Sequence, residues 1–253
     1  MTISYKIPKE NPDYSTHSAY VIKQISAIIK DAIDSKRNLI FIYTNLRHGL
    51  PLENIHKVAG PFVEAWALEQ FEDTKQSAKN PYELINVEAG KRLDAFDIVL
   101  QFRRKRSNEQ YVSADVDVKA TAEDIKTSGK SPNITSFARI RSAFLEDPDY
   151  IFIILSLKHK VYGERDPKTG MTNGIMEVIS CAAYDLKYVS DSDLNYNPAL
   201  GTGQLQIKDI HYVDLQKRTV WEFIQMIDRK FIKSNGKREW LFLAKKFGWI
   251  KVE

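Results

Sequence analysis

The 253-residue sequence has one cysteine, Cys181, so no internal disulfide can form. No set of cysteines and histidines has the spacing of zinc ligands, which excludes a structural zinc site of the finger type. The sequence also lacks any apolar run of about 18 residues, and its first residues show no basic segment followed by an apolar one. We therefore expect a cytoplasmic protein without a membrane partner.

Low-complexity tracts and extreme net charge are also missing. Hydrophobic residues make up 43% of the sequence and charged residues 28%, which is typical of a globular protein. The formal net charge of +4 permits a polyanionic partner without requiring one. The length suits one α/β domain, and the alternation of elements predicts a central mixed β-sheet flanked by helices.

Hydrophobic spacing predicts the elements of this domain. Helical spacing indicates helices over 18–33, 134–144 and 219–232, and another near the end of the chain. A further helix is predicted to start at Pro61 and to place Phe62, Trp66 and Phe71 on one face. Apolar runs predict buried strands at 38–45 and 149–159, whereas residues 1–14 are expected to form an arm and 191–204 a polar loop.

Two further strands, 94–102 and 110–120, are predicted to form an antiparallel hairpin with "RRKRSNE" at its tip. Side chains at alternate strand positions share a face, so Asp115, Asp117 and Lys119 should project together, opposite Val116 and Val118. We also place Asp97 inside the apolar run "FDIVL", where a carboxylate is costly unless it meets a cation.

Paired carboxylates beside a lysine suit metal-assisted phosphodiester hydrolysis. Asp97 and Asp117 would hold a divalent metal ion, and Lys119 would stabilise negative charge on phosphorus or position the attacking water. Asp-x-Lys alone arises by chance roughly once in a chain of this length, and a solvated strand face is the alternative. Asp94 and Asp115 remain substitutes because the strand register is not fixed, and Glu64 is an accessory candidate on its helix.

Two polar connectors could contact nucleic acid. The first, "KTSGKSPNITS", offers Lys126, Lys130, Ser131, Asn133, Thr135 and Ser136 as partners for phosphates and base edges. Its alternative interpretation is a helix cap formed by Asn133 or Ser136. The second contains Asn195, Asn197, Gln204 and Gln206, and is equally consistent with an ordinary turn before a strand.

Other catalytic signatures are missing. His48, His56, His159 and His211 stand apart from any Ser or Cys nucleophile motif, and we interpret them as surface or hydrogen-bonded interior residues. No Walker A loop occurs, and "GTG" at 201–203 is too short for a dinucleotide fingerprint.

The arrangement of Asp97 and Asp117-x-Lys119 resembles the motif of the PD-(D/E)xK nucleases. The segment "DVKATAEDIKTSGKSPNITSF" is similar to the HincII/EcoRV-like branch of type II restriction endonucleases. The segments "TNLRHGLPLENIHKVAGP", "YIFIILSLKH" and "SDSDLNYNPALGTGQLQIKDIHYV" extend the likeness to HpaI-like enzymes over nearly the whole chain. Phe96 stands where the motif usually has proline.

This resemblance implies the restriction-endonuclease fold and a Mg²⁺-dependent homodimer, with Mn²⁺ as a substitute, that cuts a palindromic site in double-stranded DNA. It points to GTTAAC cut at its centre to blunt ends with 5′-phosphates, in a bacterial restriction–modification system whose DNA methyltransferase acts on the same site. It implies Asp97 and Asp117 as metal ligands, Lys119 as the catalytic lysine, Asn133 as a base reader, Lys130 near the base stack, and Arg139 and Asn197 as DNA contacts.

Two alternatives stay open beside this expectation. One is a related nuclease with degenerate GTYRAC specificity, and the other is a non-cleaving, sequence-specific DNA-binding protein of the same fold. Within a single domain over 1–253, we expect an N-terminal helix and arm at 1–60 that serve dimerisation or embrace DNA. A catalytic core is expected at 61–160, and a DNA-reading loop with C-terminal helices at 161–253.

Overall fold

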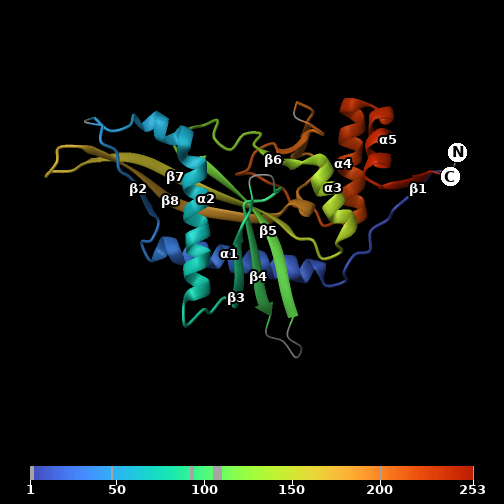
Figure 1. The fold of residues 1–253 in the computed structure, drawn as a ribbon, viewed down its shortest axis with the longest axis horizontal. Coiled ribbons are helices and arrows are strands. Elements are labelled where there is room, and N and C mark those ends of the chain that lie inside the picture. The colour runs from blue at the N-terminus through green and yellow to red at the C-terminus, as the bar shows by residue number, and fades with distance from the viewer. Residues whose placement is uncertain (1–2, 47, 92–93, 105–109, 200, 253) are drawn as a thin grey trace.

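A mixed six-stranded sheet in the order β2-β8-β7-β5-β4-β3 forms the centre of the molecule (Figure 1). The structure is a computed structural model and describes residues 3–46, 48–91, 94–104, 110–199 and 201–252. β5 and β7 pair in parallel, and the other neighbours pair antiparallel, so the predicted mixed sheet is confirmed. The strands are β2 (Leu39–Ile42), β3 (Leu84–Ala89), β4 (Ile98–Arg104), β5 (Gln110–Ala122), β7 (Phe152–Arg165) and β8 (Thr172–Asp185).

The central strands are apolar because both of their faces are covered. Residues 152–157 of β7 are all buried, as the continuous apolar run predicts. The parallel β5–β7 pair requires a crossover, which is supplied by strand β6 (Asn133–Ser136) and helix α3 (Phe137–Glu146). The run at 38–45 is different: β2 is an outer strand, and only Ile42 of its four residues is buried. Its predicted burial is therefore wrong.

Two long helices, α1 (Tyr14–Asp34) and α2 (Leu52–Gln76), pack against the large sheet and against each other. The structure corrects the predicted start of α2 at Pro61, because the helix begins nine residues earlier and Pro61 lies inside it. An interior proline costs a helix about 3 kcal/mol, and burial of Val63, Trp66 and Phe71 offsets that cost. Phe62, predicted on the buried face, is exposed.

A second, three-stranded sheet has the order β6-β10-β9, with β9 (Leu194–Asn197) and β10 (Gln204–Ile207) forming a hairpin. The predicted loop at 191–204 thus contains strand β9 and reaches the first residue of β10. Residues 134–136, predicted as the start of a helix, belong to the third strand β6 (Asn133–Ser136), and α3 begins only at Phe137. In these segments cross-strand pairing overrides the local preference for turns and helix.

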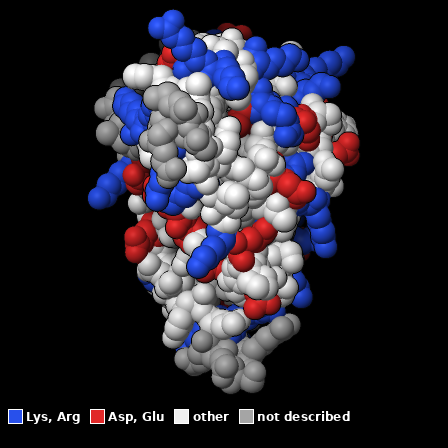
Figure 2. Space-filling view, turned by 90° about the vertical axis from the view of Figure 1, so that its right-hand side faces the viewer, with Lys and Arg blue, Asp and Glu red and all other residues white. Residues whose placement is uncertain are grey.

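The C-terminal helices α4 (Val220–Asn235) and α5 (Lys237–Lys246) lie with α3 at one end of the molecule, as Figure 1 shows. Thr219 and Glu222 form a capping box that fixes the start of α4. Beside these helices β1 (Ile3–Tyr5) pairs with β11 (Ile250–Val252), so part of the expected N-terminal arm is a strand. Figure 2 shows lysines and arginines over the upper part of this end and acidic side chains across its middle.

One buried cluster joins the elements from Tyr14 in α1 to Ile250 in β11, and a small satellite contains Ile42, Ile55, Ala59 and Met176. The helix faces predicted to be buried in α3 and α4 belong to the main cluster. Among the described helices, none has the length and apolar character needed to cross a membrane. The predicted hairpin tip at 103–109 falls largely outside the described residues.

Candidate functional site

The site forms where β4 and β5 part. Their pairing runs from Arg104–Gln110 to Ile98–Val116, so the later residues of β5 have no partner on that edge among the described strands. Asp97 lies immediately before β4 rather than inside it, which corrects the prediction from the apolar run. Its backbone N–H donates to Val116 O at 2.9 Å, and its carboxylate Oδ2 accepts from Val118 N–H at 2.7 Å. Beyond the last β4–β5 backbone pair, the carboxylate of Asp97 thus accepts the hydrogen bond that a strand carbonyl would otherwise accept from Val118 N–H.

Gly90, just after β3, holds the backbone on the other side of Asp97. Gly90 N–H donates to Asp97 O at 2.7 Å, and a Cβ at this glycine would lie 2.4 Å from Phe96 O. No side chain fits there unless the Phe96–Asp97 backbone moves. This role of Gly90 could not be predicted from the sequence, because a glycine between β3 and β4 is equally typical of a turn.

Asp117 and Lys119 lie on the free edge, two residues apart on β5. Lys119 Nζ donates to Asp117 Oδ1 at 2.7 Å, whereas Asp117 Oδ2 is buried without a hydrogen-bond partner among the described residues. Burial raises the pKa of Asp117 to about 7; Lys119 opposes this rise, and Asp97 and Glu64 add to it. A bound cation would stabilise the ionised carboxylate that burial disfavours.

Glu64 reaches the same cluster from α2. Burial raises the pKa of Glu64, Asp97 raises it further and Lys119 lowers it, which places the three side chains in electrostatic range. Glu64 lines a cavity of about 380 Å³ together with Asp97, and another of about 340 Å³ together with Lys119. All four residues predicted for the catalytic cluster are thus brought together.

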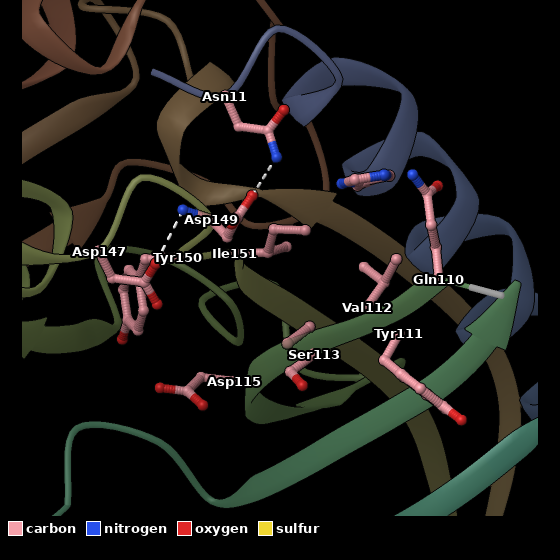
Figure 3. A pocket seen from close by; sticks show the side chains of 12 residues that line it. Asn11, Gln110, Tyr111, Val112, Ser113, Asp115, Asp147, Asp149, Tyr150 and Ile151 are labelled. Carbon is pink, nitrogen blue, oxygen red and sulfur yellow. Dashed lines mark hydrogen bonds between the residues drawn. The ribbon is translucent and has the colours of Figure 1, made fainter. Parts of the chain in front are cut away.

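The two substitute carboxylates make other contacts. Asp94 lines the cavity of about 380 Å³ beside Glu64 and Asp97, but its side chain is exposed and accepts from Lys91 N–H at 2.7 Å. Asp115 accepts a hydrogen bond from Tyr150 and lines a different cavity of about 480 Å³. Figure 3 shows its side chain among the residues of this cavity, which include Asp147. This cavity lies where β5 has not yet met β7, whose pairing starts at Asp115. The geometry therefore favours Asp97 and Asp117.

The carboxylates suit a hard divalent cation such as Mg²⁺. Their donors are oxygens, and one of them, Asp117 Oδ2, lacks a partner. Within the described ranges no three His, Cys, Asp or Glu side chains form a ready metal site. Mg²⁺ does not need one, because it is usually bound through one or two carboxylates, several waters and a substrate phosphate. Asp97 and Asp117 fit that pattern.

The predicted base readers lie on the small sheet. In β10 the side chains of Leu205 and Ile207 are buried and those of Gln204 and Gln206 point the other way. Gln206 pairs with Asn195 and Asn133, and its Nε2 donates to Asn133 Oδ1 at 2.9 Å. The second row pairs Gln204 with Asn197 and Ser136. Six neutral polar side chains thus form one surface, called here the amide face.

Other predicted DNA contacts lie around or beneath this face. Thr135 is buried, and its Oγ1 has no partner among the described residues, so it lies below the amide face. Lys130 is ion-paired with Asp209, and Ser131 N–H donates to Lys208 O at 3.1 Å. Lys126 and Arg139 are exposed. Neither Ser136 nor Asn133 caps α3 with its side chain, so the capping alternative is wrong.

A cavity of about 300 Å³ lies between the amide face and the segment that leads into β4. Asp94 and Ala95 line it from the hairpin, and Ser136, Arg139 and Gln204 line it from the other side. Thr202 completes the lining, and its hydroxyl lies 3.0 Å from Ser136 Oγ. Sequence reasoning missed Thr202, because nothing distinguishes it from an ordinary turn residue before the hairpin is formed.

The comparisons with known proteins agree with this geometry. The family model "Type II restriction endonuclease HpaI" matches residues 1–248. The chain belongs to this family. It is 54% identical over 225 residues to the type II restriction enzyme HpaI of Haemophilus parainfluenzae, covering 89% of this chain and 87% of that one.

A solved structure, NlaIV restriction endonuclease, is similar over 87% of this chain and 85% of that chain, with 14% identity and a TM-score of 0.46. Family membership makes this chain a restriction endonuclease, a DNA-binding hydrolase of the nuclease class. The predicted family is therefore confirmed.

Proposed function

We propose that this HpaI-family enzyme is a Mg²⁺-dependent homodimer that cuts both strands of the palindrome GTTAAC at its centre. The products would be blunt ends with 5′-phosphate and 3′-hydroxyl groups. The observation that carries the chemistry is the meeting of Asp97, Asp117, Lys119 and Glu64 at the open edge of β5. The 54% identity to HpaI supports the choice of site.

Asp97 and Asp117 would hold the metal ion. When bound, the ion polarises the scissile phosphate and lowers the pKa of its water. The backbone N–H of Val118 fixes Asp97, and burial holds Asp117 in one position. Both carboxylates are therefore oriented before substrate arrives, which lowers the cost of organising the transition state.

Lys119 has two partners in turn in this proposal. Without substrate its ammonium bonds Asp117 Oδ1. In the complex with DNA, the same ammonium would bond a phosphate oxygen on which negative charge grows as water attacks phosphorus. The 3′ oxygen leaves with the electron pair of its bond to phosphorus and takes up a proton, and the 5′-phosphate stays on the other fragment. Half-buried Glu64, with its raised pKa, is placed to accept a proton from water.

The amide face would read the site. Asn and Gln side chains can bond adenine N6 and N7 together, and the central pairs of GTTAAC are A·T and T·A. Asn133, Gln206, Gln204, Asn197 and Ser136 offer such groups without net charge, while Lys126, Lys130, Ser131 and Arg139 lie where phosphates could be bound. A two-fold dimer presents one amide face to each half of a palindrome.

The experiment is digestion of a fully sequenced plasmid with the purified enzyme, with Mg²⁺, with Mn²⁺ and with EDTA, followed by sequencing of the ends. Blunt cutting at GTTAAC alone, dependent on the metal, supports the whole proposal. Cutting at GTYRAC keeps the mechanism and changes the assignment of the readers. A DNA-binding protein without hydrolysis would bind a GTTAAC duplex and leave the plasmid intact under all three conditions.

The proposal has a cellular consequence. A host must protect its own GTTAAC sites, so a DNA methyltransferase of the same specificity should accompany the enzyme. Plasmid methylated in every GTTAAC site is then expected to resist cleavage. Full cleavage of methylated and unmethylated plasmid alike would contradict the role in restriction–modification.

A further inference from the structure

Two histidines, His56 on α2 and His159 on β7, lie side by side near the part of β5 that carries Asp117 and Lys119, called here the catalytic edge. Their ring centroids are 5.7 Å apart with the planes inclined by 41°. Both histidines line the cavity of about 340 Å³ that Lys119 and Glu64 also line. The catalytic mechanism proposed above uses neither histidine.

Three of the four ring nitrogens in this pair are buried without a hydrogen-bond partner among the described residues, so they are available to bind a ligand. His159 is 2% exposed, and both of its nitrogens are buried without a hydrogen bond in the described part of the chain. His56 Nδ1 is in the same state, and only His56 Nε2 meets a group, the Asp124 carboxylate at 3.4 Å. Buried polar atoms without partners are rare because each costs about 1–3 kcal/mol. The expectation of satisfied interior histidines is wrong at this position.

His159 has the electronic state of a metal ligand. Burial lowers the pKa of His159 to about 4, and neighbouring His56 lowers it further while Asp124 opposes the shift. The ring is neutral at pH 7, so a nitrogen lone pair is available. Asp124 beside His56 Nε2 resembles the carboxylate that commonly orients a metal-binding imidazole and leaves the other nitrogen free to coordinate.

The spacing fits one ion between the rings. Imidazoles that bind a tetrahedral Zn²⁺ through nitrogens at about 2.0–2.1 Å have centroids roughly 5 Å apart, slightly closer than observed here. We propose that His56 and His159 form a binding site for a transition-metal ion such as Zn²⁺ or Co²⁺, oriented by Asp124 and separate from the carboxylate site. Two nitrogen ligands are fewer than a complete structural site has, so water fills the remaining positions, and binding is reversible.

Equilibrium dialysis against Zn²⁺ tests the site in the full-length protein. The double variant Asp97→Asn/Asp117→Asn removes the catalytic carboxylates and is expected to retain one Zn²⁺ per chain. His159→Gln and His56→Gln in that background should each weaken Zn²⁺ binding at least about tenfold, and Asp124→Asn about tenfold. His211→Gln, a histidine outside the pair, is the matched control and should bind as the background does.

Two further readouts separate ligand loss from misfolding. Co²⁺ bound by imidazole nitrogen should give visible d–d absorption that the His211→Gln control keeps and the His56→Gln variant loses. Zn²⁺ should raise the thermal midpoint of the carboxylate-free background and leave that of His56→Gln unchanged, because only a ligand that binds the folded state stabilises it. Unchanged Zn²⁺ affinity in both histidine variants, or loss of all binding in the carboxylate-free background, would overturn the proposal.

Discussion

The catalytic edge of β5 and the amide face of the small sheet differ in charge and in burial. At the catalytic edge, ionisable side chains lie half-buried or buried, and burial raises the pKa of Asp117 to about 7. On the amide face, neutral side chains bond one another across strands and stay within reach of solvent. Burial there falls on the apolar side of the sheet, at Leu205 and Ile207.

The difference fits the roles that we propose for the two regions. A group that binds a metal ion or stabilises developing charge works best in a low dielectric and in a fixed position. A group that reads base edges must be able to exchange its hydrogen bonds for those of DNA, and neutral amides do this at little electrostatic cost. We therefore expect changes at the catalytic edge to alter the rate of cleavage, and changes on the amide face to alter the choice of site.

The largest effect is expected for Asp117→Asn. Loss of a metal-binding carboxylate should reduce cleavage of a GTTAAC duplex by at least about a thousandfold, because several kcal/mol of transition-state stabilisation disappear. Binding of the same duplex, measured by fluorescence anisotropy in Ca²⁺, should change little. Wild-type cleavage by this variant in Mg²⁺ would show that the active site is assigned to the wrong carboxylate.

Lys119→Gln should have the next largest effect. Removal of the ammonium is expected to reduce kcat by about a hundredfold to a thousandfold while KM changes little, since the lost contact belongs mainly to the transition state. Single-turnover cleavage at several enzyme concentrations separates the two constants. An increase in KM with unchanged kcat would instead assign Lys119 to ground-state DNA binding.

Gly90→Ala tests whether backbone packing positions Asp97. The added Cβ would meet Phe96 O, so the Asp97 carboxylate should shift and cleavage should fall about tenfold to a hundredfold with DNA binding retained. Gly60→Ala is the matched control, because its Cβ would meet only Glu64 Oε1 at 3.9 Å and alanine favours the helix interior by about 1 kcal/mol. Equal activity of the two variants would remove Gly90 from the argument.

The smallest effect on rate, and the largest on selectivity, is expected for Gln206→Ala. Loss of one amide should reduce discrimination at its base pair by about 1–3 kcal/mol, and cleavage of singly substituted sites should rise relative to GTTAAC. Gln225→Ala on the exposed side of α4 is the control and should cut as the wild type does. A uniform loss of activity on all substrates would indicate that Gln206 supports the sheet rather than reads DNA.

Local sequence was sufficient to locate a helix or strand where one face of that element is buried. The spacing of apolar residues located α1, α4 and the hairpin of β4 and β5, because hydrophobic periodicity reports burial directly. It failed at Pro61, where packing of the residues that follow keeps the helix intact. It also failed at 191–204, where polar side chains hide a strand whose exposed face gives no apolar signal.

The sequence by itself determined the family and the Asp97, Asp117-x-Lys119 pattern, because long shared strings and alternate strand positions can both be read along the chain. Only the tertiary structure gives a reason to prefer Asp97 over Asp94, and Asp117 over Asp115, as the proposed metal ligands. The register of β4 against β5 sets which carboxylates face one another, and register depends on contacts between residues far apart in sequence. The pairing of His56 with His159 has the same origin, since helix α2 and strand β7 meet only when the sheet is assembled.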